Sequence, residues 1–127
     1  MDWTFRSDLP IYSQLVDKIK LGIISGGLAP GERLASVRDL AMEAGVNPNT
    51  MQRALQELER EGLVFSQRTS GRFVTEDVRE IERAKRAVAD ERLRDFLGAM
   101  EKLGYSRGGI LALLKEKEEQ DEADTGV

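Results

Sequence analysis

The segment that spans residues 28–62 constrains the fold of this chain more than any other. It holds two blocks in which apolar residues recur at helical spacing, as in helices with one buried face. The inward positions are Val37, Leu40 and Ala41 in the first block, and Met51, Ala54, Leu55 and Leu58 in the second. Gly45 separates the blocks and Gly62 follows the second. Because glycine commonly ends helices, the segment predicts two short helices joined by a tight turn, a helix-turn-helix.

Capping residues stand at the start of both helices. Ser36 precedes the first, and Asp39 three residues later resembles a capping box. Asn47 is a good N-cap for the second helix, and Pro48 suits the first helical position, where its missing N–H needs no partner. The sequence therefore marks where each helix begins.

The outward face of the second helix carries small polar and basic side chains: Asn49, Thr50, Gln52 and Arg53. Such groups bond base edges and phosphates, so we expect this helix to enter the major groove of DNA. Amides match adenine edges, which favours base reading by Asn49 and Gln52. Thr50 is expected to contact a phosphate, and Arg53 suits either a phosphate or a base.

Two further positions near the helix starts have alternative interpretations. Capping alone explains Asn47, although a helix N-terminus is also a phosphate site and both roles can coexist. Arg38 lies on the outward face of the first helix, where its planar fork suits a phosphate or a guanine edge. The alternative is an exposed arginine that pairs with Asp39 or Glu43.

The flanking segments complete a small domain. Apolar residues recur every four positions from Ile11 to Ile23, which predicts a helix that ends at Gly26. Two strand-like runs at 63–66 and 72–75 flank a loop of turn-forming residues, which predicts a β-hairpin. Three helices and a hairpin make a winged helix-turn-helix, so the expected fold class is mainly α (α+β), with a DNA-binding domain at residues 1–75.

The C-terminal part has helical patterning with an apolar stripe. Its expected members are Ile81, Val88, Leu93, Phe96, Leu97, Met100, Ile110, Leu111 and Leu114. A helical pair cannot bury this stripe alone, so residues 76–119 are expected to form a dimerisation element with a second copy of the chain. The acidic residues 120–127 are expected to be a disordered tail. Trp3 and Phe5 either join the dimer interface or cover the core.

Composition argues against catalysis. The 127 residues include neither cysteine nor histidine, which excludes thiolate and Ser-His nucleophiles and zinc sites built from these residues. A small hydrolase based on carboxylates is the remaining enzymatic alternative, and no paired-acid motif supports it. We expect no enzyme activity, no cofactor and no metal. The apolar runs are too short to span a bilayer and no signal peptide is recognisable, so a cytoplasmic protein is expected.

The net charge of −4 is unevenly distributed. Residues 1–75 carry nine Lys and Arg against nine Asp and Glu, whereas residues 76–127 carry ten against fourteen. The acidic excess therefore lies outside the expected DNA-binding domain. Because local charge decides whether a surface neutralises phosphates, the acidic total does not argue against DNA binding.

Several motifs resemble those of the GntR family of bacterial transcription regulators. They are Pro10-Ile11-Tyr12, Pro30-Gly31-Glu32-Arg33-Leu34, Ser36-Val37-Arg38-Asp39-Leu40-Ala41, Val46-Asn47-x-Asn49-Thr50, Ala54-Leu55-x-x-Leu58-x-x-x-Gly62-Leu63 and Gly71-x-Phe73-Val74. The short C-terminal part, with Leu103-Gly104-Tyr105-Ser106, resembles the YtrA-type group. In that group two C-terminal helices form the dimer, and members often control transporter operons. Two departures are Ala35, where the family usually has proline, and the wing tip, which is usually Gly-x-Gly-Thr.

With this resemblance, the full set of expected DNA contacts is Arg33, Arg38, Asn47, Asn49, Thr50, Gln52, Arg53, Arg68, Thr69, Ser70, Gly71 and Arg72. The resemblance implies a homodimeric regulator, expected to be a repressor, that binds double-stranded DNA at an inverted-repeat operator. The alternative is a protein-interaction module that uses the winged fold without operator binding. A small-molecule effector is possible and is not identified by any residue pattern.

Overall fold

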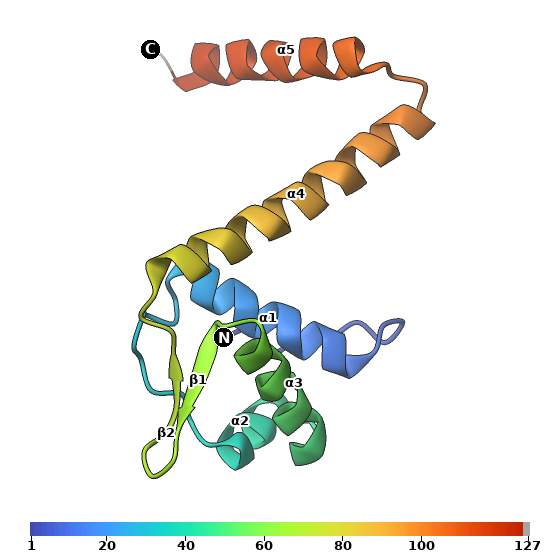
Figure 1. Cartoon of the computed structure of the whole chain (residues 1–127). Coiled ribbons are helices and arrows are strands. Elements are labelled where there is room, and N and C mark those ends of the chain that lie inside the picture. The colour runs from blue at the N-terminus through green and yellow to red at the C-terminus, as the bar shows by residue number, and fades with distance from the viewer. Residues whose placement is uncertain (126–127) are drawn as a thin grey trace. The chain divides into compact units, whose positions relative to one another are not determined.

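The computed structural model describes residues 1–125, with the backbone alone at residue 125. The chain folds into five helices and a two-stranded antiparallel sheet within this range (Figure 1). The elements are α1 (Ile11–Ser25), α2 (Val37–Ala44), α3 (Pro48–Arg60), β1 (Val64–Gln67), β2 (Gly71–Val74), α4 (Val78–Lys102) and α5 (Arg107–Thr125). The expected mainly α fold with a β-hairpin wing is confirmed. No helix within residues 1–125 combines the length and apolar character that a membrane span needs.

The helix boundaries follow from local chemistry. The Ser36 hydroxyl accepts a hydrogen bond from the Asp39 backbone N–H at 3.1 Å and so caps α2. Gly45 then takes a φ of 71°, a left-handed conformation that glycine adopts without a Cβ penalty. The backbone N–H of Val46 bonds back to the Ala41 carbonyl at 3.0 Å, which closes the turn. The predicted turn between α2 and α3 is therefore confirmed.

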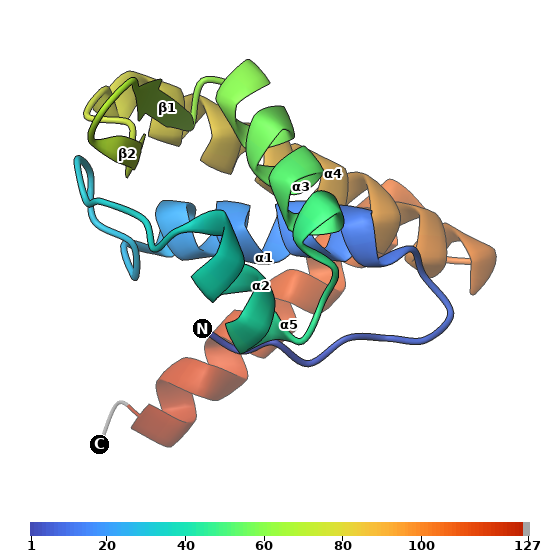
Figure 2. The same ribbon diagram turned by 90° about the horizontal axis from the view of Figure 1, so that it is seen from below.

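One apolar core joins α1, α2, α3 and the hairpin, which Figure 2 shows grouped together. Its fully buried large side chains from these elements are Leu15, Ile19, Ile23, Met51, Leu55, Leu58, Leu63 and Val74. Trp3 and Phe5 are partly buried against this core with ring centroids 6.4 Å apart, and the Trp3 indole N–H donates to Glu43 at 3.1 Å. Of the two predicted alternatives, these aromatic residues therefore cover the core.

The hairpin is extended by a short segment from the loop before α2. In its register Val64 lies opposite Val74 and Ser66 opposite Arg72. Arg33 forms an isolated bridge with Phe73, and the Leu34 N–H donates to the Arg72 carbonyl at 2.8 Å. These bonds anchor β2 on both sides, so the backbone of the wing is fixed close to its base.

The chain divides into two compact units, Met1–Lys85 and Arg86–Val127. The boundary differs from the predicted one at residue 75, because Ile81 and Ala84 in the first turns of α4 pack against the core of the first unit. Ile81 is only 8% exposed there. Ile81 was expected in the dimer interface, but its side chain is a core residue of the first unit.

The second unit contains the rest of α4 and the whole of α5. Gly104, with a φ of 98°, ends the turn after α4, and Ser106 caps α5 by accepting from the Gly109 N–H at 3.1 Å. Helix α5 continues to Thr125, so residues 120–125 are helical and differ from the predicted disordered tail. Gln120, Glu122 and Ala123 have high helix propensity, which helps a segment without an apolar face to continue the helix. Residues 126–127 lie outside the described range.

Candidate DNA-binding interface

Helix α3 is oriented by its apolar stripe. Its buried residues Met51, Ala54, Leu55 and Leu58 all have an exposed fraction of 0%. The remaining positions of the first two turns are consequently turned outward: Asn49 and Arg53 are exposed, and Thr50 and Gln52 are half-buried. The structure thus brings all four expected contact residues to the outward side of one helix.

The start of α3 presents a free helix N-terminus. The side-chain oxygen of Asn47 accepts from the Asn49 N–H at 2.8 Å, and Pro48 occupies the first helical position. Asn47 is itself exposed, so its capping bond lies at the surface. The partial positive charge of a helix N-terminus favours an anion, and this end of α3 is suited to a DNA phosphate.

Arg53 is held by an aromatic ring from α1. Its guanidinium carbon lies 4.6 Å from the centroid of the Tyr12 ring. Stacking of this kind restricts the side chain while leaving the charge unpaired with any acid. Tyr12 is a supporting residue that the sequence analysis did not identify, because the two residues come from helices far apart in the chain.

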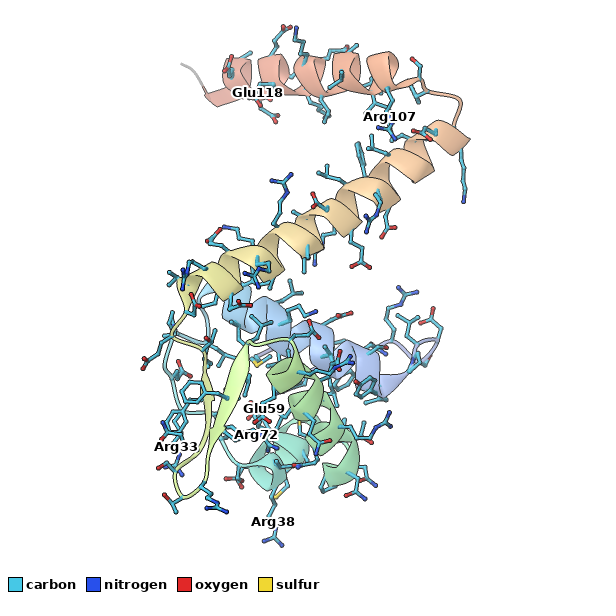
Figure 3. The ribbon with its side chains drawn as sticks, viewed as in Figure 1. Arg33, Arg38, Glu59, Arg72, Arg107 and Glu118 are labelled. Atoms are coloured by element: carbon cyan, nitrogen blue, oxygen red, sulfur yellow. The ribbon has the colours of Figure 1, made fainter. Side chains whose placement is uncertain are left out.

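Arg38 lies in the first turn of α2 and is exposed, with its side chain pointing away from the domain (Figure 3). No carboxylate within residues 1–125 lies at ion-pair distance from it, so the alternative pairing with Asp39 or Glu43 is not formed. Glu43 instead accepts from Trp3. The guanidinium of Arg38 is therefore fully available to a ligand.

The wing tip combines an exposed arginine with small residues. Arg68, Thr69 and Gly71 are exposed, and Ser70 is half-buried. Gly71 has a φ of 105°, and a Cβ placed on it would lie 3.4 Å from the Nε of Arg33. The Arg33 side chain therefore lies against the backbone of Gly71, which brings an exposed guanidinium to the same tip as Arg68.

Arg72 does not belong to this exposed group, although it was expected to contact DNA. Its side chain is only 18% exposed, and its Nε lies 3.4 Å from Glu59 Oε1 of α3 (Figure 3). Its guanidinium also donates to Gln52 Oε1 at 3.4 Å. The expectation of a free wing charge is thus not met, because residue 72 faces α3 and finds an acid there.

Glu59 and Ser66 complete this contact, and the sequence analysis did not identify either residue. The Ser66 hydroxyl donates to Glu59 Oε1, and Ser66 lies opposite Arg72 in the hairpin register. Gln52 and Glu59 are seven residues apart, so they lie two helical turns apart on the same face of α3. This spacing could have indicated a shared face of α3. Only the position of the wing shows that Arg72 contacts both residues on that face.

The arginines of the first unit fall into two groups. Arg6, Arg60, Arg72, Arg79 and Arg83 form ion pairs with carboxylates. Within residues 1–85, four arginines have no such partner: Arg33, Arg38, Arg53 and Arg68. All four were among the expected DNA contacts. A guanidinium without an internal partner retains its charge for a phosphate or a base.

Arg60 shows the contrast on α3 itself. Its Nη2 lies 2.6 Å from Glu57 Oε1, and this hydrogen bond lowers the pKa of Glu57 and raises the pKa of Arg60. The pair is nearly neutral as a unit. Within residues 1–125, no cluster of acidic residues is arranged to hold a metal ion.

Comparison with known proteins agrees with this geometry. Residues 11–74 match the family described as "Bacterial regulatory proteins, gntR family". The chain is also 37% identical over 115 residues to the uncharacterized HTH-type transcriptional regulator YhcF of Bacillus subtilis, covering 91% of this chain and 95% of that protein. The chain belongs to the GntR family. Because GntR proteins are regulators, the expectation that the chain is not an enzyme is confirmed.

Two further similarities define its place among GntR regulators. The chain is 36% identical to the HTH-type transcriptional repressor YtrA of B. subtilis over 93 residues, which cover 72% of each protein. A GntR family transcriptional regulator from Listeria monocytogenes has a similar structure, with a TM-score of 0.81 and 38% identity over 88% of this chain and 98% of that one. The expected likeness to YtrA-type regulators is therefore confirmed.

A DNA complex is known for a more distant GntR-type domain. The structure of the DNA-binding domain of AraR in complex with operator ORX1 covers 57% of this chain and 93% of that one, with a TM-score of 0.53 and 27% identity. This GntR protein is a DNA-binding transcription regulator.

Proposed function

We propose that this GntR protein is a repressor that binds an inverted-repeat operator as a homodimer and blocks the promoter that contains it. The observation that carries the proposal is the separation of its arginines. Among the described arginines of the first unit, Arg33, Arg38, Arg53 and Arg68 have no ion pair, whereas the other five are paired with acids. Arg53 lies on α3 and Arg38 on α2, whereas Arg33 and Arg68 lie at the wing; at the N-terminus of α3, Asn47, Asn49 and Thr50 add polar groups.

The proposed contacts divide between backbone and bases. Arg38, Arg68 and Arg33 suit phosphates, because they are long, exposed and unpaired. Asn49 and Gln52 suit base edges, because they lie on the outward side of α3 beyond its N-terminus. Thr69 and Gly71 leave the wing tip narrow enough for close approach to a DNA backbone. Phosphate contacts supply affinity and position, and base contacts supply the operator sequence.

Apolar residues of the second unit support the proposed dimer. Leu93 is 55% exposed, Leu111 65% and Leu114 51%. A groove of about 370 Å³ lies between α4 and α5 and is lined by Phe96, Met100 and Leu113, among others. Val88 and Leu97 are half-buried on the same helix. A second copy that covers these residues would remove apolar surface from water. Ile110 is already 1% exposed in one chain and contributes to the fold of this unit.

The two-fold symmetry of such a dimer supports an inverted-repeat operator. Two identical reading helices related by a two-fold axis bind two half-sites of opposite orientation. Repression is supported by the likeness to YtrA, which is named a transcriptional repressor. The resemblance to YtrA-type regulators extends the proposal to an operon that encodes a transporter.

Selection of bound sequences from a random duplex pool with the full-length protein, at near-physiological salt, tests the proposal. An inverted repeat with fixed half-site spacing is the expected result. The double variant Gln52→Ala/Arg53→Ala is expected to lose the recovered operator, whereas the matched control Arg60→Ala/Arg79→Ala, which removes two acid-paired arginines, is expected to retain it. Recovery of sequence-blind binding alone would contradict the proposal and favour a protein-interaction module.

A further inference from the structure

The contact between Arg72 and Gln52 links the wing to the reading helix. Arg72 lies in β2, and its Nη1 lies 3.4 Å from Oε1 of Gln52 on α3. A guanidinium has only donors, so the side of the amide that faces it must be the carbonyl oxygen. The orientation of the Gln52 amide therefore follows from the chemistry of its neighbour.

The backbone and the side chain of Arg72 are both restrained. Its backbone carbonyl accepts from the Leu34 N–H at 2.8 Å, and its Nε lies 3.4 Å from Glu59 Oε1. The same carboxylate oxygen accepts from Ser66, the cross-strand partner of Arg72. Arg72 and Glu59 have exposed side-chain fractions of 18% and 30%, so water screens this pair only partly. The buried Nε of Arg72 has no hydrogen-bond partner among the described residues, so Glu59 restrains the side chain through charge and Gln52 through the hydrogen bond from Nη1.

An amide with its oxygen held toward the wing has a restricted choice of bases. The adenine edge offers a donor at N6 and an acceptor at N7, so it needs the oxygen and the nitrogen of one amide to face it together. Arg72 takes one of the two lone pairs of that oxygen and holds it toward the wing, which disfavours that arrangement. The amide nitrogen remains, with two N–H donors. The guanine edge offers two acceptors, N7 and O6, which match those donors.

We infer that Arg72 is a positioning residue that makes Gln52 a reader of guanine instead of adenine. The inference rests on the proposed function, because it assumes that Gln52 faces a base in the operator. It assigns a specificity role to Arg72, one of the two residues by which the wing tip Thr69-Ser70-Gly71-Arg72 departs from the usual Gly-x-Gly-Thr of the family. The wing then acts on base choice through α3, without a base contact of its own.

Competitive binding to four duplexes tests this inference. The duplexes carry the recovered operator and differ only at the half-site position where Gln52→Ala abolishes base discrimination. The native protein is expected to prefer guanine to adenine there. Arg72→Met, which keeps the length of the side chain and removes its donors, is expected to move the ratio of the two affinities about tenfold toward adenine.

Two controls separate positioning from simple charge loss. Arg68→Met removes an exposed wing arginine and is expected to weaken all four duplexes by one common factor, with no change in the ratio. In the Gln52→Ala background, Arg72→Met is expected to leave the ratio unchanged, because the residue through which it acts is gone. If thermal denaturation shows that Arg72→Met is unfolded, Arg72→Lys replaces it, since an ammonium keeps the charge but cannot span Glu59 and Gln52 as a planar fork does.

The outcomes are distinguishable. A native preference for adenine overturns the role of Arg72 alone. The same holds if the operator is still bound but neither Arg72→Met nor Arg72→Lys changes the ratio of the guanine and adenine affinities. Failure to recover any preferred sequence with the native protein overturns the proposed function and this inference with it.

Discussion

Arg53 of α3 stacks its guanidinium 4.6 Å from the centroid of the Tyr12 ring of α1. The ring orders the side chain before DNA is present, so less conformational entropy is lost on binding. It also leaves the charge unpaired, unlike that of Arg60 at the other end of the same helix. The positively charged side chain of Arg53 is thus already ordered on α3 before DNA binds.

We expect Arg53→Ala to weaken operator binding and, if the contact is to a phosphate, to reduce the slope of log affinity against log salt by about one. Titration of labelled operator at several salt concentrations measures both quantities. Arg60→Ala is the matched control on the same helix and is expected to change neither, because Glu57 already neutralises Arg60. Equal losses for the two variants would show that α3 responds to net charge rather than to a specific contact.

Ile81 and Leu93 lie on one helix but are expected to serve different purposes. Ile81 is 8% exposed in the core of the first unit, whereas Leu93 is 55% exposed in the second. Ile81→Ala is expected to lower the free energy of unfolding by about 2–5 kcal/mol, as for other truncations of large core side chains. Leu93→Ala is expected to weaken dimerisation with little effect on the fold of the first unit.

Urea denaturation monitored by the fluorescence of Trp3, which packs on the first core, measures the stability change. Sedimentation at several protein concentrations measures dimerisation. If the Ile81→Ala dimer dissociated without a loss of unfolding free energy, Ile81 would be an interface residue. That result would contradict its assignment to the core.

Local signals in the sequence predicted most of the DNA-binding domain. Ser36 and Asn47 caps, the left-handed Gly45 turn and the stripe from Met51 to Leu58 each depend on neighbours within a few residues. Periodicity alone could not show whether Ile81 packs in the core of its own chain or against a second copy. An apolar stripe has the same helical spacing in both cases. The acidic end of α5 was misjudged for a related reason, since helix propensity persists where an apolar face stops.

The wing was the least predictable part of the site. Arg72 has the charge and position of a DNA contact in the sequence, but its role depends on whether β2 turns it toward solvent or toward α3. That orientation is set by the bridge at Arg33 and by the hairpin register, both of which join segments that are not adjacent in the chain. Burial of its side chain against Glu59 is a tertiary property, and no local pattern reports it.

Asp77 makes the start of α4 sensitive to acid. Its carboxylate accepts from the Arg79 backbone N–H at 3.0 Å and from Arg79 Nε at 3.2 Å. The side-chain hydrogen bond from Arg79 is the main cause that lowers the pKa of Asp77 below its ordinary 3.8. A lowered pKa in the folded state stabilises the fold above pH 3.8, and this contribution is lost as the pH falls through the lower folded value.

We therefore expect Asp77→Asn to be less stable than the native protein at pH 6, and the difference to shrink as the pH falls below 3.8 and through the lower folded pKa of Asp77, because Asp77 then becomes neutral like the asparagine. Urea denaturation across this pH range measures the change. Arg79→Ala, which removes the partner instead, is expected to reduce the same pH dependence. A stability difference that is constant from pH 6 to pH 3 would mean that the charge of Asp77 has no part in it.

Asn47 allows the capping role and the DNA role to be separated. Its side-chain oxygen accepts from the Asn49 N–H at 2.8 Å, so Asn47→Ala is expected to lower the free energy of unfolding by about 0.5–2 kcal/mol. Asn47→Asp keeps an equally good cap and is expected to preserve stability. It also places a negative charge at the helix N-terminus, where the proposed phosphate lies, so it is expected to weaken operator binding at low salt more than at high salt. Denaturation and salt-dependent operator titration of both variants measure the two roles separately, and an Asn47→Asp protein that binds as tightly as the native one would leave Asn47 with the capping role alone.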